Sequence, residues 1–77
     1  MDILDEIYDA VIDGKTDIVI SKIKEALENN IQPDIIMKEG LISGLDEVGR
    51  LYEEGKFFVP EMLIAARTTQ AALKDLR

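Results

Sequence analysis

The spacing of apolar residues constrains this chain more than any other feature of its sequence. Apolar side chains recur every three or four positions in four stretches, roughly residues 2–13, 16–29, 33–53 and 60–77, as they do along one face of a helix. Glycine, asparagine and proline separate these stretches, and such residues commonly end or begin helices. The sequence therefore predicts one domain over residues 1–77 with an all-α fold, a four-helix bundle without strands.

The connections between the stretches predict how the helices are arranged. Only a couple of residues around Gly14 separate the first two stretches, so their helices should form an antiparallel hairpin. Thr16 is a plausible N-cap of the second helix, and Asn29 and Asn30 can adopt the left-handed conformation that closes it. The third helix is expected to be the longest, because its apolar pattern is not interrupted.

Three glycines lie inside the predicted third helix. Gly40, Gly44 and Gly49 each cost about 1 kcal/mol relative to alanine in an exposed helix, so their presence needs a packing explanation. Gly40 and Gly44 are one turn apart on the same face. They predict either close contact with another helix or room for a ligand, and the sequence leaves both open.

The composition excludes several classes of function. Asp and Glu number 16 against 9 Lys and Arg, and the net charge of −7 argues against binding to nucleic acid or to an anionic membrane surface. Cysteine and histidine are absent, which excludes disulfides, metal sites ligated by either residue and Ser-His-Asp chemistry. No apolar run approaches the ~20 residues of a membrane span, and the acidic start after Met1 is unlike a signal peptide. We therefore expect a cytoplasmic protein.

The fourth helix carries an unusual number of small side chains. Met62, Ala65, Thr69, Ala72 and Leu76 share one stripe, where a helix that only filled a core would carry more leucine and isoleucine. We interpret this small-residue stripe as a smooth, open surface. Such a surface would let a flat or bulky partner approach closely.

Two adjacent phenylalanines, the only ones in the chain, lie between Gly55 and Pro60. They belong to the segment "EVGRLYEEGKFFVPEMLIAA", the most specific part of a resemblance that covers essentially the whole chain. The sequence resembles the helical cap domain of cobalamin-dependent methyltransferases. It is most similar to the small corrinoid proteins of anaerobic methylamine, methanol and methoxyaromatic metabolism, and is also similar to the equivalent module of methionine synthase.

This resemblance implies a domain that lies over the upper face of the corrin ring during cobalamin-dependent methyl transfer and shields the cobalt–methyl bond. It gives Phe58 the role of a lid and leaves Phe57 to fill the core. The cofactor-binding residues that it implies are Phe58, Met62, Ala65, Thr68 and Thr69, with no catalytic residue and no metal ligand. An apolar lid would exclude water and oxygen without offering a competing nucleophile.

The same resemblance implies partners. Family members continue into a Rossmann-like α/β domain with an Asp-x-His-x-x-Gly motif whose histidine binds cobalt from below, and residues 1–77 contain no such motif. We therefore expect this chain alone to retain cobalamin weakly or not at all. It would be a non-catalytic part of a system with a partner methyltransferase subunit. The last helix has no glycine or proline stop, so we also expect further sequence after Arg77.

Three other expectations rest partly on this resemblance and partly on the residues. Separated from an α/β domain, the chain should form a homodimer through the small-residue stripe and Phe58. A helical protein-interaction module that grips a partner through the fourth helix is the alternative function. A hydrolytic enzyme is a third interpretation, but its carboxylates lie around a solvated helix face without a convergent second group. These carboxylates are Asp46, Glu47, Glu53 and Glu54.

Overall fold

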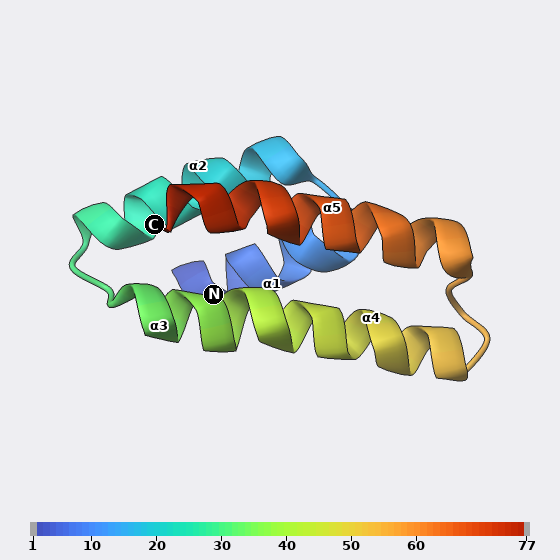
Figure 1. The fold of residues 1–77 in the computed structure, drawn as a ribbon. Coiled ribbons are helices and arrows are strands. Elements are labelled where there is room, and N and C mark those ends of the chain that lie inside the picture. Colours follow the sequence, from blue (N-terminus) through green and yellow to red (C-terminus); the bar gives the residue numbers. More distant parts are fainter. Residues whose placement is uncertain (1, 77) are drawn as a thin grey trace.

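The fold consists of helices joined by short connections. The computed structural model describes residues 2–76, apart from the side chain of Asp75. The elements are α1 (Ile3–Asp13), α2 (Thr16–Glu28), α3 (Pro33–Ile35), the π-helical segment η1 (Ile36–Ile42), α4 (Ser43–Glu53) and α5 (Val59–Asp75). α3, η1 and α4 follow one another without a break and form one long helix. Together with α1, α2 and α5 it makes four helices (Figure 1). The predicted all-α four-helix bundle is confirmed, and no strand occurs within residues 2–76.

Three of the helices end in the same way. Gly14, Asn30 and Gly55 have φ angles of 69°, 65° and 77°, in the left-handed region that glycine and asparagine tolerate best. After each of them the next N–H donates to the carbonyl five residues earlier, which closes the last turn of the helix. These bonds are Lys15 to Ala10 at 3.0 Å, Ile31 to Ala26 at 3.1 Å and Lys56 to Leu51 at 2.9 Å. The predicted stops at Gly14, Asn30 and Gly55 are confirmed.

The predicted N-cap of the second helix is wrong. Lys15 occupies the cap position of α2, and its side chain makes no capping bond. Thr16 is already helical, and its hydroxyl oxygen lies 2.9 Å from the Thr68 hydroxyl oxygen of α5. The threonine hydroxyl therefore contacts another helix and does not cap the start of α2.

α1 packs directly against Gly40 and Gly44 of the long helix formed by α3, η1 and α4. A Cβ added at Gly40 would lie 2.8 Å from Cγ2 of Ile7, and one added at Gly44 would lie 2.9 Å from Cβ and Cγ1 of Val11. Both distances are shorter than real side chains tolerate, so close helix packing explains these glycines. A Cβ at Gly49 would meet nothing within 4 Å.

The π-helical segment was not predicted, and the packing against α1 offers a reason for it. Ile36, Gly40, Gly44 and Val48 are all buried and follow one another at intervals of four. On a regular helix of 3.6 residues per turn, each step of four turns the side chain by about 40° beyond a full circle. The wider turns of a π-helix reduce this drift. η1 thereby lets these four residues face α1 over a longer part of the helix.

Most of the core is made of branched aliphatic and small side chains. The buried cluster joins α1, α2, η1 and α5, and its largest members are Ile7, Val11, Val19, Ile23, Ile36 and Leu41. Ala26 and Ala72 belong to the same cluster. Small side chains let α2 and α5 approach each other closely, and the two helices lie side by side in Figure 1. In the part of the chain that the structure describes, no helix is long and apolar enough to cross a membrane.

Candidate functional site

The N-terminal end of α5 exposes a group of large apolar side chains. Phe58 is 65% exposed, and Val59, Leu63 and Ile64 on the first two turns are 54%, 53% and 47% exposed. We call these four residues the α5 patch. Monomeric proteins usually bury such side chains, and an exposed apolar group of this kind commonly marks a contact surface. The α5 patch is therefore the candidate site.

Backbone hydrogen bonds hold Phe58 in place. Its φ and ψ are −119° and 179°, so its backbone is extended immediately before the first helical residue. The Phe58 N–H donates to Oε1 of Glu61 at 2.7 Å, and the Phe58 carbonyl accepts from the N–H groups of Glu61 and Met62 at 3.1 and 3.3 Å. Phe58 has no side-chain acceptor, so only the glutamate half of a capping box is present. Both backbone polar groups of Phe58 are thereby bonded.

The structure divides the five predicted cofactor-binding residues into two groups. Phe58 is open to solvent, and Met62 is half-buried one turn further on. Ala65, Thr68 and Thr69 are buried, with exposed fractions of 1%, 0% and 7%. The Thr68 hydroxyl lies against that of Thr16, and the Thr69 hydroxyl donates to the Ala65 carbonyl at 3.0 Å. Only Phe58 and Met62 are thus accessible from outside the bundle.

The interpretation of the small-residue stripe as an open surface is wrong. Ala65, Thr69 and Ala72 point into the bundle, and Met62 and Leu76 are half-buried. The physical reason is that small side chains let α5 lie close to its neighbouring helices. The open face of α5 is a different one, and its apolar residues near the start of the helix are those of the α5 patch.

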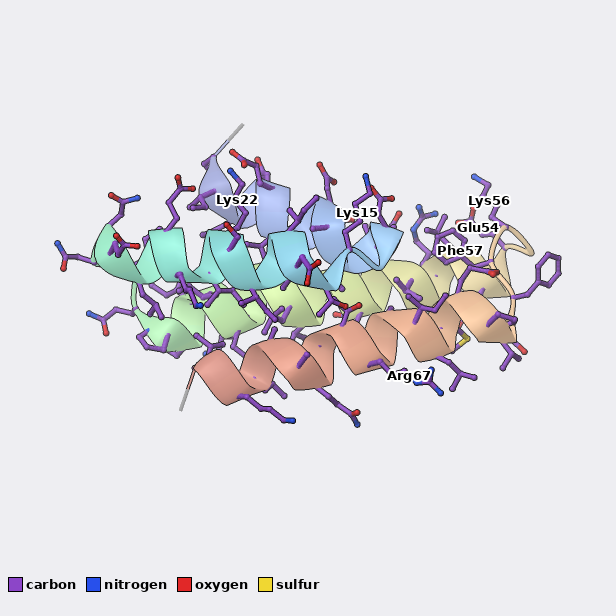
Figure 2. All side chains as sticks on the ribbon, turned by 90° about the horizontal axis from the view of Figure 1, so that it is seen from above. Lys15, Lys22, Glu54, Lys56, Phe57 and Arg67 are labelled. Atoms are coloured by element: carbon purple, nitrogen blue, oxygen red, sulfur yellow. The ribbon has the colours of Figure 1, made fainter. Side chains whose placement is uncertain are left out.

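Phe57 differs from Phe58, but it does not fill the core as predicted. It is half-buried, and it is not a member of the buried cluster. Its N–H donates to the Leu51 carbonyl at 3.2 Å, which ties the connection to the last turn of α4. Figure 2 shows Phe57 at the same end of the bundle as Glu54 and Lys56. Phe57 therefore packs at the end of the bundle, and Phe58 is the more exposed of the pair.

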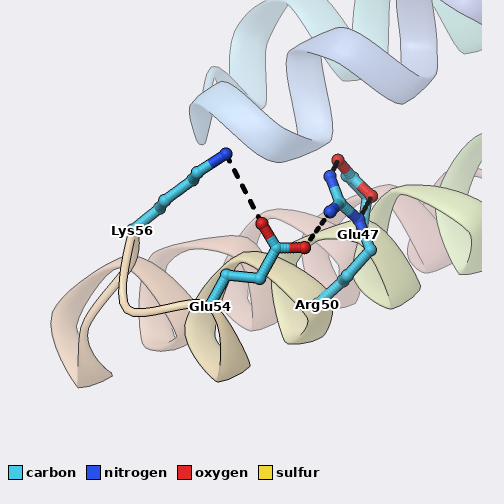
Figure 3. A network of polar contacts seen from close by, with 4 residues as sticks. All are labelled: Glu47, Arg50, Glu54 and Lys56. Atoms are coloured by element: carbon cyan, nitrogen blue, oxygen red, sulfur yellow. Dashed lines mark hydrogen bonds and ion pairs between the residues drawn. The ribbon is translucent and has the colours of Figure 1, made fainter.

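An ion-pair network lies on α4 and reaches the connection to α5 (Figure 3). Arg50 binds Glu47 through two bonds, Nε to Oε1 at 2.6 Å and Nη2 to Oε2 at 2.5 Å, and also binds Glu54. Lys56 Nζ lies 3.4 Å from Oε1 of Glu54. The hydrogen bond from Arg50 lowers the pKa of Glu47. Such exposed pairs each stabilise a fold by less than about 1 kcal/mol.

This network also bears on the hydrolytic interpretation. Two of the four candidate carboxylates, Glu47 and Glu54, are paired with the cation Arg50. A lowered pKa keeps Glu47 ionised, which is unsuited to a general acid. Asp46 and Glu53 are exposed on the same helix. The residues that the structure describes contain no group of three or more carboxylates that could hold a metal ion.

The α5 patch lies outside two shallow hollows on the surface of the bundle. One shallow hollow of about 350 Å³ is lined by Asp2 and by residues of α1, η1 and α4. Another of about 580 Å³ lies along α2, between Asp17 and Glu28. Neither includes a residue of α5.

Comparison with known proteins identifies the family. The family model described as a B12 binding domain matches residues 3–77. The chain belongs to this B12 binding domain family. The predicted resemblance is confirmed, because the match extends over nearly the whole chain.

This B12 binding domain has relatives among corrinoid proteins. It is 38% identical over 78 residues to the dimethylamine corrinoid protein of Methanosarcina barkeri, an alignment that covers 97% of this chain and 36% of that protein. It is 32% identical over 76 residues to a corrinoid protein of Desulfitobacterium hafniense, covering 99% of this chain and 35% of the relative. The domain thus spans about a third of the length of the curated relatives it matches.

The B12 binding domain also resembles a solved structure. A chain in the crystal structure of the methanol:cobalamin methyltransferase complex from Methanosarcina barkeri superposes with a TM-score of 0.89 at 26% identity. The superposition covers 96% of this domain and 29% of that chain. The arrangement of the helices in the domain is therefore that of a larger cobalamin-dependent system.

Sequence reasoning missed two features of this B12 binding domain. Leu63 and Ile64 were not predicted to be exposed, because helical periodicity alone does not say which side of α5 the other helices cover. The role of Glu61 as a hydrogen-bond acceptor was also missed. Its signal was present in the sequence, since Phe58 and Glu61 have the three-residue spacing of a capping box at the start of a helix.

Proposed function

We propose that this domain is the cap of a methyl-carrying corrinoid protein and that Phe58 covers the upper face of the corrin. The exposed position of Phe58 carries this proposal. One of only two phenylalanines in the chain is 65% exposed, although its backbone is fully bonded. Burying a side chain of this size against a ligand would be favourable by about 2 kcal/mol. The family match, the corrinoid relatives and the methyltransferase complex support a corrin as that ligand.

The residues of the α5 patch fit one face of a corrin. All four side chains are apolar, and about half or more of each is exposed. A large, flat ring requires such a surface. When bound, the corrinoid supplies a cobalt centre that carries the methyl group. Phe58 would exclude water and oxygen from the upper side of the ring, and Met62 would lie behind it. The partner would be a cobalamin-binding α/β domain, together with a methyltransferase subunit.

The buried residues Ala65, Thr68 and Thr69 have a different part in this proposal. They would act through packing, since their side chains are covered by other helices. The hydroxyl pair of Thr16 and Thr68 fixes α5 against the start of α2. This contact would help to hold α5, which carries Met62 and begins directly after Phe58, in a fixed position within the bundle.

The chain by itself should retain cobalamin weakly or not at all. The α5 patch can cover one face only, and the sequence contains no histidine or cysteine that could bind cobalt. We expect methylcobalamin to pass freely through a membrane that holds back the chain, at micromolar concentrations of both. The same measurement with the cobalamin-binding α/β domain added provides the positive control. Saturable retention by the chain alone would contradict this expectation.

A protein-interaction module that acts through α5 remains the second candidate function. The exposure of Val59, Leu63 and Ile64 favours it, since these side chains could equally contact a protein. The two functions differ in what a change at Phe58 affects. Under the cap function, Phe58→Ala alters the stability of the bound methylcobalamin toward light. Under the interaction function, it alters only the affinity for a protein partner.

The predicted homodimer cannot form through the small-residue stripe, because Ala65, Thr69 and Ala72 are buried, so we propose that the isolated chain forms weak homodimers through the α5 patch. Pairing two copies would cover the same four side chains on each, as a symmetric contact does. The net charge of −7 opposes this pairing, so it should strengthen with salt. Sedimentation at two salt concentrations measures it, and Leu63→Lys should abolish it. Ile18→Lys on α2, where the side chain is 43% exposed, is the matched control. A strict monomer at high concentration in both salts would contradict the expectation.

A further inference from the structure

We propose that Glu61 is a positioning residue that fixes the lid phenylalanine through its backbone. This inference rests on the proposed function, which gives Phe58 its role over the cofactor. Side-chain packing cannot fix Phe58, because 65% of the residue is exposed. The backbone at this position then sets the direction of the Cα–Cβ bond, from which the ring extends. Among the residues that the structure describes, Glu61 supplies the side-chain hydrogen bond to that backbone.

The bonds on both sides of Phe58 show why Glu61 matters. On the α4 side, the N–H groups of Lys56 and Phe57 both donate to the Leu51 carbonyl, at 2.9 and 3.2 Å. On the α5 side, the Phe58 carbonyl accepts from the first turn of the helix. The Phe58 N–H lies between these two anchored segments, and Glu61 Oε1 is its partner at 2.7 Å. Without Glu61, the Phe58 N–H would lose this partner, and the φ angle of Phe58, which orients its Cα–Cβ bond relative to α4, would be less restricted.

The chemistry of this bond makes it stronger than an ordinary one. The acceptor is a carboxylate, and charge-assisted hydrogen bonds are shorter and stronger than neutral ones. Glu61 also lies in the first turn of α5, where a negative charge interacts favourably with the helix dipole. Glu61 is half-buried, so water competes with it less than with a fully exposed side chain. The bond can therefore hold an exposed aromatic residue in one orientation.

Amide hydrogen exchange on the chain itself tests this inference. In Glu61→Ala, the Phe58 amide should exchange about tenfold faster, because a hydrogen bond to a charged group is lost. The amides of the central core should keep their protection. Glu61→Gln retains an acceptor oxygen and should restore most of the protection of Phe58. Glu53→Ala removes the same charge from an exposed position at the end of α4 and should change nothing at Phe58.

Two outcomes of the exchange measurement would overturn the inference. One is an unchanged exchange rate of the Phe58 amide in Glu61→Ala, which would mean that the bond does not hold the peptide unit. The other is equal acceleration in Glu61→Ala and Glu61→Gln. That result would assign the effect to the charge at the start of α5 and not to the hydrogen bond.

Photolysis of bound methylcobalamin separates this inference from the proposed function. In a corrinoid protein that carries this domain, Glu61→Ala should accelerate photolysis in the same direction as Phe58→Ala, with Glu61→Gln close to the unaltered protein. If Phe58→Ala accelerates photolysis and Glu61→Ala does not, Phe58 protects the cofactor but Glu61 does not position it. If the exchange result holds and neither variant affects photolysis, Glu61 positions Phe58 but the proposed lid function fails.

Discussion

Replacing Gly44 with leucine should lower the stability of this domain by about 3 kcal/mol or more, because overpacking a contact this close forces helices apart. Even the first added atom, Cβ, would lie 2.9 Å from Val11 and 3.3 Å from the backbone oxygen of Tyr8. A backbone atom cannot move aside as the end of a flexible side chain can. A domain of this size has a total stability of only roughly 4–12 kcal/mol. Thermal unfolding followed by circular dichroism should show a fall in Tm of more than about 10 °C.

Gly49 offers a matched control on the same helix. A Cβ there would meet nothing within 4 Å, so Gly49→Ala should raise the stability by about 0.5–1 kcal/mol through its effect on helix propensity. Gly44→Ala should lower it. The same glycine-to-alanine substitution is thus expected to lower the stability at residue 44 and to raise it at residue 49. An unchanged Tm in Gly44→Leu would show that α1 does not pack on this face.

Phe58→Ala should leave the fold intact and expose the cofactor in a corrinoid protein that carries this domain. The side chain is 65% exposed and contributes little to the core, so the stability should change by less than about 1 kcal/mol. Methylcobalamin should then photolyse several-fold faster, and reduced cobalt should oxidise faster, because water and oxygen reach the upper face of the ring. Absorbance spectroscopy under controlled light measures the first rate, and stopped-flow mixing with oxygen measures the second.

Phe57→Ala is the control for this experiment. Phe57 is half-buried at the end of the bundle, so its loss should lower the stability more than the loss of Phe58 while changing both rates less. If Phe57→Ala accelerates photolysis and Phe58→Ala does not, the roles of the two aromatic residues are reversed. If neither does, the cap does not protect the methyl group through this connection.

The number of helices and most of their ends could be predicted from the amino-acid sequence. Gly14, Asn30 and Gly55 end helices through bonds to carbonyls only a few residues away, so the signal and its effect lie in the same short segment. Periodic apolar residues identified the same four helical stretches. The exposed position of Phe58 agrees with the lid that the family resemblance implied, although its contact with a corrin stays a prediction.

The face of α5 that is covered could not be predicted from the sequence, because it depends on how the helices pack together. A stripe of alanine and threonine is compatible with an open surface and with close packing, because small side chains permit both. The neighbouring helices resolved this in favour of packing, and they left Leu63 and Ile64 outside. The hydroxyl of Thr16 and the π-helical turns of η1 show the same principle. Each depends on a residue of another helix, Thr68 in one case and the α1 face around Ile7 in the other, and no local pattern contains that information.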